Sequence, residues 1–170
     1  VHFDRWTGES VVAEEGKKIV EEGLEKGVFE KDEDGSVFVD FDDESMPNTI
    51  VQRDDGATLY LTRDIANIIK RENEGFDLNF YVVANEQDLH FKQLFRLAED
   101  FGVSEMESEH ISYGMLRLES GSMSSSKGNI IKMTDLLEEA KKRAEEVEQR
   151  DVGNAKEVGY GAVKYANLNV

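Results

Sequence analysis

Tyr60 and Asp64 are the first residues whose types and spacing could do chemistry. They stand four positions apart in DGATLYLTRDIANIIKR, residues 55–71, where an Asp-Gly turn signal runs into an apolar stretch. If a helix begins there, both side chains lie on one face, because positions i and i+4 are neighbours on a helix surface. A phenol and a carboxylate could then act together on one ligand. Taken singly, Tyr60 is equally a core aromatic and Asp64 a charge near a helix N-terminus.

The small-residue loop GSMSSSKGN, residues 121–129, is the second candidate. Small residues let backbone N–H groups approach a phosphate closely, and Lys127 adds a mobile positive charge. The loop lacks the GxxxxGK[ST] spacing of a P-loop, which argues against a Walker-type site. Taken alone, a surface loop with a solvated lysine is the favoured interpretation.

Polar residues also follow the apolar run NFYVVA, residues 79–84. Gln87 and His90 should lie beyond the carboxyl end of a strand, in a loop over 85–90, where they could contact a small molecule. His90 is equally well explained as a packed residue at a helix N-terminus. Glu9 precedes another predicted helix, where a glutamate is favourable anyway. No histidine pair or carboxylate cluster has metal-ligand spacing, so we predict no protein-held metal.

The composition limits the class of protein. Of 170 residues, 39% are hydrophobic, and the net charge is −17, from 37 acidic and 20 basic residues. An acidic, well-solvated surface argues against a large nucleic-acid face, because phosphate binding relies on Lys and Arg. Cysteine is absent, which excludes disulfides and thiolate metal sites and is compatible with the cytosol. No apolar run suits a membrane span, and the start does not resemble a signal peptide.

The order of the elements predicts an α/β fold with a parallel sheet. An amphipathic helix over 11–27, with Ile19, Val20 and Leu24 on its inner side, precedes a hairpin over 28–41 and a strand over 49–53. The run 79–84 reads as a strand covered on both faces. A helix over 86–102, with Leu89, Leu94, Phe95 and Leu97 at helical spacing, leads to a strand over 110–118.

Two further helices are predicted near the end of the chain. The first spans 134–150, with Thr134 as its N-cap and Leu136, Leu137 and Ala140 on its inner face. The second spans 153–168 despite its glycines. Between them and the strand over 110–118 lies the small-residue loop.

Five motifs occur in the order and approximate spacing of arginyl-tRNA synthetase, a class I enzyme: FDRWTGES, DGATLYLTRDIA, VVANEQDLHFKQLF, HISYGML and SMSSSKGNIIKMTDLLEEA. The resemblance runs along nearly the whole chain and implies the second half of a Rossmann-type catalytic domain. It implies an arginine–tRNA ligase that uses ATP with Mg²⁺, and L-arginine and tRNA(Arg) as partners, in the cytoplasm. By the same resemblance, arginine is contacted by four residues: Glu9, Tyr60, Asp64 and Gln87.

The small-residue loop resembles the mobile signature loop that stabilises the ATP phosphates in this family. Ser124 and Lys127 match it and are the implied catalytic residues. Ser122 and Ser125 stand where the general class I pattern has lysines, and Ser126 stands where arginyl enzymes often have arginine. The resemblance implies a larger set of ATP-binding residues: His90, His110, Gly114, Met115, Met123, Ser124 and Lys127. The implied first step is in-line attack of the arginine carboxylate on the α-phosphorus. It needs no general base, because the carboxylate is already ionised.

The resemblance also implies a domain layout in which residues 1–170 form part of the catalytic domain. Residues 28–53 are an inserted hairpin region, 79–150 the second half of the nucleotide fold, with its signature loop at 120–129, and 151–170 the start of the connection to an anticodon-binding bundle. The His-Ile-Gly-His signature is absent from the sequence, so we expect a fragment that is inactive alone. An exposed apolar sheet edge would favour its self-association.

Two alternatives remain at this point. One is another class I synthetase or related nucleotidyl transferase, which would share the mobile loop. The other is a non-catalytic interaction domain on a synthetase-like fold, which the three serine departures favour. The second alternative predicts that the four arginine-contacting residues do not converge in space.

Overall fold

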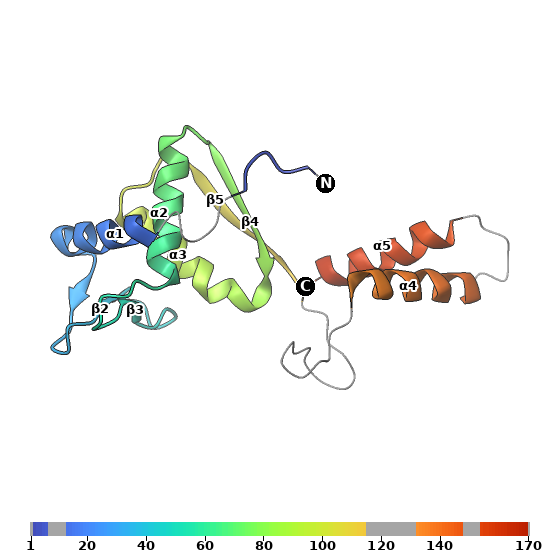
Figure 1. Cartoon of the computed structure of the whole chain (residues 1–170), viewed down its shortest axis with the longest axis horizontal. Helices are drawn as coiled ribbons and strands as arrows, with labels where there is room; N and C mark the ends of the chain where they lie inside the picture. Colours follow the sequence, from blue (N-terminus) through green and yellow to red (C-terminus); the bar gives the residue numbers. More distant parts are fainter. Residues whose placement is uncertain (1, 7–12, 115–131, 148–153, 170) are drawn as a thin grey trace. The chain divides into compact units, whose positions relative to one another are not determined.

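The computed structural model describes residues 2–6, 13–114, 132–147 and 154–169 (Figure 1). The described chain is mixed α/β, with a small parallel sheet and a small antiparallel one, as the sequence predicts. It divides into two compact units. The first comprises residues 1–81 and 87–110, and the second comprises residues 82–86 and 111–170.

The antiparallel sheet confirms the hairpin expected over residues 28–41 and the strand expected over 49–53. Its strands β1 (Glu30–Lys31), β2 (Val37–Val39) and β3 (Thr49–Gln52) lie side by side in chain order. Gly35 takes a positive φ of 93° in the turn between β1 and β2. The Asp34 carboxylate accepts a hydrogen bond from the Ser36 N–H at 2.8 Å. Hydrogen bonding to Ser36 lowers the pKa of the Asp34 carboxyl.

Helix α1 (Ala13–Lys26) packs on α2 (Tyr60–Asn73). Ile19 and Val20 of α1 are buried as predicted, but the prediction for Leu24 is wrong, because it is 37% exposed. Gly23 takes the inner position instead, and the ring of Phe29 lies where a side chain at residue 23 would stand. The close approach of a ring to the helix backbone therefore turns Leu24 outward.

Helix α2 is the centre of the first unit and packs on α1, α3 (Asp88–Asp100) and β3. Ile65 and Ile68 are fully buried in α2, and Leu94 and Leu97 are fully buried in α3. Leu89, which the spacing assigned to the inner face of the helix, is 43% exposed because the buried row of α3 begins at Phe91. The buried Gln93 side chain donates to the Pro47 carbonyl oxygen at 3.0 Å and to Thr49 Oγ1 at 2.8 Å, which ties α3 to the start of β3.

Strands β4 (Leu78–Ala84) and β5 (Glu107–Tyr113) form the parallel sheet. Tyr81 of β4 faces α3, where its ring lies 4.9 Å from that of Phe91. The described residues leave the opposite face largely uncovered, since Leu78 is 46% and Phe80 is 49% exposed. The prediction of a strand covered on both faces is therefore wrong for this chain.

The second unit contains the helices α4 (Met133–Val147) and α5 (Ala155–Leu168), which lie side by side (Figure 1). Leu136, Leu137 and Ala140 are the partly buried face expected for α4. Thr134 is not its N-cap, because the Lys132 carbonyl already accepts from Asp135 and Leu136 N–H at 3.0 and 3.1 Å. Gly159 of α5 lets the two backbones approach, since a Cβ there would lie 2.7 Å from backbone atoms of Ala140.

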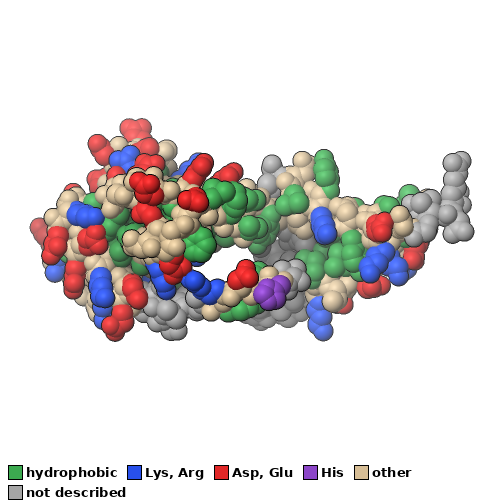
Figure 2. Space-filling view, turned by 90° about the horizontal axis from the view of Figure 1, so that it is seen from above, with side chains coloured by type: hydrophobic (Ala, Val, Ile, Leu, Met, Phe, Trp, Pro, Cys, Tyr) green, Lys and Arg blue, Asp and Glu red, His purple; other side chains and the backbone are tan. Residues whose placement is uncertain are grey.

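The surface of the first unit is strongly acidic. Figure 2 shows carboxylate side chains scattered over the part that holds the three-stranded sheet and α1, with Lys and Arg side chains between them. Such mixed, patchy charge fits a well-solvated surface better than a nucleic-acid face. Within the described ranges, no helix has both the length and the apolar composition needed to cross a membrane.

Candidate active site

A tight turn at residues 55–57 precedes α2. The Asp55 carboxylate accepts from Ala57 N–H at 2.9 Å, and Gly56 supplies the positive φ of 82° that the turn requires. Leu59 N–H then bonds the Val51 carbonyl at 2.9 Å, which pairs the incoming chain with β3. The helix begins directly afterwards, at Tyr60. The predicted helical spacing of Tyr60 and Asp64 is thereby confirmed.

Tyr60 lies on the surface at the first position of α2. Its side chain is 66% exposed, so its interpretation as a core aromatic is wrong. The guanidinium of Arg63 lies 6.0 Å from the ring centroid and also donates to the Thr58 carbonyl at 3.2 Å. A cation close to an aromatic ring adds a modest attraction. The Tyr60 hydroxyl and ring are thus accessible to a ligand.

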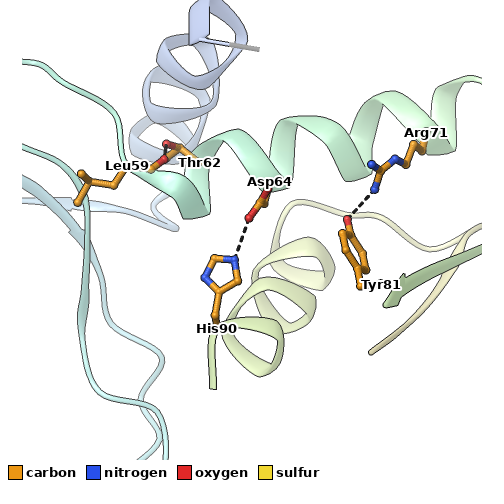
Figure 3. A network of polar contacts seen from close by, with 6 residues as sticks. All are labelled: Leu59, Thr62, Asp64, Arg71, Tyr81 and His90. Carbon is orange, nitrogen blue, oxygen red and sulfur yellow. Dashed lines mark hydrogen bonds and ion pairs between the residues drawn. The ribbon is translucent and has the colours of Figure 1, made fainter. Parts of the chain in front are cut away.

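Asp64 is joined to His90 across 26 residues of sequence. Asp64 Oδ2 accepts from His90 Nε2 at 2.8 Å, and the two side chains point toward each other from α2 and α3 (Figure 3). The Asp64 side chain is 37% exposed and that of His90 is 24% exposed. This bond brings two stretches that the sequence singled out, YLTRD and QDLH, into contact.

Gln87 lies close in sequence to this contact. It ends a short 3-10 turn, Asn85–Gln87, and helix α3 starts at the next residue. The loop expected over 85–90 is therefore shorter than predicted, and His90 belongs to the first turn of α3. The Gln87 side chain makes no capping hydrogen bond and is exposed, which leaves its amide accessible.

A second Asp–His pair, which was not predicted from the sequence, lies at the same end of α3. His110 Nδ1 of β5 is 3.3 Å from Asp88 Oδ1, and the His110 side chain is only 10% exposed. The Phe91 ring stacks on His110 with its centroid 4.2 Å away and meets the His90 ring nearly edge-on at 5.4 Å. Phe91 thus packs against both imidazoles.

A third polar contact, between α2 and β4, was also missed. Arg71 donates to the Tyr81 hydroxyl at 2.9 Å and to Asn79 Oδ1 at 3.3 Å (Figure 3). Burial raises the pKa of the Tyr81 hydroxyl above its ordinary value, while the nearby Arg71 charge opposes the rise. Both residues occur at positions that periodicity alone assigns to packing, so only the fold reveals the pair.

The second unit contains Gly114, directly after β5. Its N–H donates to the Asn167 carbonyl at the end of α5, at 2.7 Å. A short backbone bond of this kind fixes the direction in which the chain leaves the strand. Five of the predicted site residues lie outside the described residues: Glu9, Met115, Met123, Ser124 and Lys127. The serines at 122, 125 and 126 lie outside them as well.

Two hollows in the first unit are lined by other residues. One, of about 320 Å³, lies among Arg5, Lys70, Arg71 and the apolar residues around Leu78. Another, of about 420 Å³, lies between the end of α3 and the start of β5. Neither hollow includes Asp64 or His90. Among the described residues, no three His, Asp or Glu side chains cluster as metal ligands would.

The comparisons with known proteins match this chain along its whole length. The sequence model of the family described as "tRNA synthetases class I (R), catalytic domain" matches residues 1–170. Arginine–tRNA ligases of Flavobacterium psychrophilum and Treponema denticola are each 39% identical to the chain over all of its residues. The chain spans 31% and 29% of the length of these two curated relatives.

A solved structure matches the fold. The crystal structure of arginyl-tRNA synthetase from Plasmodium falciparum superimposes with a TM-score of 0.65 and 18% sequence identity. The match covers 95% of this chain and 28% of that one. At this identity the similarity shows the fold alone, whereas the match to the family model extends over every residue. The chain therefore belongs to the class I arginyl-tRNA synthetase family and represents part of its catalytic domain.

Proposed function

We propose that this chain is the part of an arginine–tRNA ligase that binds arginine and helps to bind ATP. The parent enzyme would convert L-arginine and ATP to arginyl-adenylate and then transfer the arginyl group to tRNA(Arg). The names of the curated relatives support this proposal, as does the match to the catalytic domain of the family. We further propose a cytoplasmic parent and the domain layout given above, with the isolated 170 residues inactive.

The arginine site is proposed to consist of Tyr60, Asp64, Gln87 and Glu9. The single observation that supports it best is the 2.8 Å contact between Asp64 and His90, because it joins the start of α2 to the start of α3. Tyr60 and Gln87 flank that contact in the sequence, and both are exposed. Two of the segments that would have to act together, the start of α2 and the start of α3, are thus in contact.

The chemistry of these groups suits a guanidinium. A guanidinium presents a planar fork of N–H donors, and a carboxylate can accept two hydrogen bonds from it. Such charge-assisted hydrogen bonds are about twice as strong as neutral ones. A phenol beside it can pack on the flat cation or hydrogen-bond to it. A lysine ammonium lacks the fork, so the same groups would discriminate between the two basic amino acids.

ATP is proposed to bind next to this site, with Mg²⁺ as part of the substrate. The proposed contacts are six of the seven residues implied by the family resemblance: His110, Gly114, Met115, Met123, Ser124 and Lys127. The seventh, His90, is hydrogen-bonded to Asp64. In this scheme the arginine carboxylate attacks the α-phosphorus in line, and pyrophosphate leaves. The protein would contribute positioning and charge stabilisation rather than a general base.

The substitution Asp64→Asn in the full-length parent tests the arginine site. It removes the negative charge but keeps the shape of the side chain. Because the Asp64 side chain is 37% exposed, we expect a cost below that of a fully desolvated pair, about 2–3 kcal/mol, or roughly a 30- to 150-fold rise in arginine KM. The readout is arginine-dependent exchange of pyrophosphate into ATP.

The matched control is Asp100→Asn on α3. Asp100 pairs with Arg96 one turn away on an exposed face, and such pairs contribute little. We expect this variant to keep the parent's arginine KM. An unchanged arginine KM in Asp64→Asn would contradict the proposal and favour a non-catalytic role for this fold.

A further inference from the structure

The side chain of Asp64 requires a hydrogen-bond partner to be held in one rotamer. It projects from the side of α2, its side chain is more than a third exposed, and its carboxylate accepts a hydrogen bond from His90. An exposed aspartate without a partner samples several rotamers, and each ligand it binds must first select one of them. A fixed partner on a neighbouring helix removes that cost.

We propose that His90 is a positioning residue for Asp64, rather than primarily an ATP contact. This inference rests on the proposed arginine site. His90 donates its Nε2 proton to Asp64 Oδ2 and thereby fixes the carboxylate. Oδ1 and the second lone pair of Oδ2 then remain for the guanidinium, because a carboxylate has about four acceptor positions.

The surroundings of His90 suit this role. The imidazole ring meets the buried Phe91 ring nearly edge-on, and Phe91 in turn stacks on His110. His110 is held by Asp88 and is almost completely buried. The ring that orients Asp64 is thus supported by packed groups from α3 and β5, and these are built on the core of the first unit.

The identity of the donor also matters. An imidazole that donates from Nε2 occupies one lone pair of the carboxylate and leaves its other acceptor positions for the cation of the substrate. A lysine or arginine in place of His90 would instead compete with the guanidinium for the same carboxylate.

The test uses four variants of the full-length parent. His90→Leu fills a similar volume without a donor. His90→Gln keeps an N–H near the position of Nε2, and His90→Asn carries its amide too close to the backbone to reach Asp64. The fourth is the double variant His90→Leu/Asp64→Asn. Each variant is measured for arginine affinity by calorimetry without ATP and for both KM values by pyrophosphate exchange. Thermal unfolding confirms that each variant is folded.

We expect His90→Leu and His90→Asn to weaken arginine binding by about tenfold, the scale of one hydrogen bond to a charged group. ATP KM should change less than about twofold, and His90→Gln should recover most of the arginine affinity. In the Asp64→Asn background, His90→Leu should have no further effect, because residues that act as a unit are not additive.

Three results would overturn the proposal: a larger effect on ATP KM than on arginine binding, a glutamine variant no better than leucine, or effects that multiply in the double variant. If Asp64→Asn binds arginine normally, the arginine site itself fails, and the role of His90 fails with it. If Asp64→Asn is impaired while His90→Leu is normal, only the positioning role is wrong.

Discussion

The substitution Gly159→Ala tests how the packing of α5 supports the end of β5. A Cβ at residue 159 would lie 2.7 Å from the carbonyl carbon and oxygen of Ala140 and from the Lys141 nitrogen. Non-bonded carbon atoms rest about 3.5–4.0 Å apart, so α5 would have to move away from α4 by about 1 Å. The obstacle is backbone, which cannot rotate aside as a side chain can.

Gly161→Ala is the matched control, because among the described residues no atom beyond its own stretch of α5 lies within 4 Å of a Cβ at that position. Both substitutions gain the same helix propensity, about 1 kcal/mol for glycine to alanine. That gain cancels when the two variants are compared. The difference between them should then equal the cost of overpacking, about 1–3 kcal/mol.

The displacement should reach the proposed ATP site through one hydrogen bond. The Asn167 carbonyl of α5 accepts from the Gly114 N–H directly after β5, so a shift of α5 pulls on that segment. In the full-length parent we expect Gly159→Ala to speed amide exchange in α4 and α5 and to raise ATP KM several-fold. Gly161→Ala should slow the exchange slightly and leave KM unchanged. Equal behaviour of the two variants would refute the reasoning.

Four further predictions each concern the substitution of a single side chain. Burial raises the pKa of the Tyr81 hydroxyl in the folded protein, so the unfolded chain loses this proton at a lower pH. The stability that the protonated hydroxyl contributes is therefore present below pH 10 and is lost as the pH rises further. Tyr81→Phe should abolish this part of the alkaline decline in the urea midpoint of unfolding. Gln93→Leu should cost about 1–3 kcal/mol of unfolding free energy by leaving its acceptors unpaired, and an unchanged urea midpoint would contradict this. Lys127→Ala should lower kcat more than it raises arginine KM, if this lysine acts mainly in the transition state. In sedimentation, Phe80→Ser should reduce self-association of the isolated chain, whereas Ile50→Ser, equally exposed on β3, should not.

The helices and strands could be predicted from the sequence because their periodicity and turn residues agree. Gly27 and Gly102 have positive φ values and lie directly after the helix over 13–26 and at the end of the helix over 88–100, where the sequence predicted the stops. The inner face of α1 was less predictable. Its buried row includes Gly16 and Gly23, and at Gly23 the ring of Phe29 occupies the place of a side chain. A hydrophobicity pattern is read from side chains, so it does not identify glycines as part of the buried face.

Two other errors have physical causes of the same kind. A continuous apolar run indicates what a strand can bury, but burial also requires a covering layer, and the described residues leave Leu78 and Phe80 about half exposed. That layer depends on neighbours outside the local sequence. A threonine before an apolar run resembles an N-cap, yet Lys132, two residues earlier, already begins the hydrogen-bonding of α4.

The Asp64–His90 contact shows where prediction from sequence stops. Both residues were recognised, each from its own motif, and the sequence assigned them to different ligands. The contact depends on how α2 and α3 pack, and side-chain patterns do not specify which two polar residues on facing helices will meet. The contact supports the proposed role of His90 in orienting Asp64.

The position of Asp64 depends on how firmly α2 is held. Asp64 and Arg71 are seven residues apart, so they lie on one face of α2, and each reaches a different neighbour: His90 on α3 and Tyr81 on β4 (Figure 3). Between them, Ile65 and Ile68 are fully buried. A rotation or a one-residue slide of α2 would break both polar contacts and expose those isoleucines. The carboxylate proposed to bind arginine is therefore positioned by the core of the first unit, and mutations that loosen that core should weaken arginine binding before they unfold the protein.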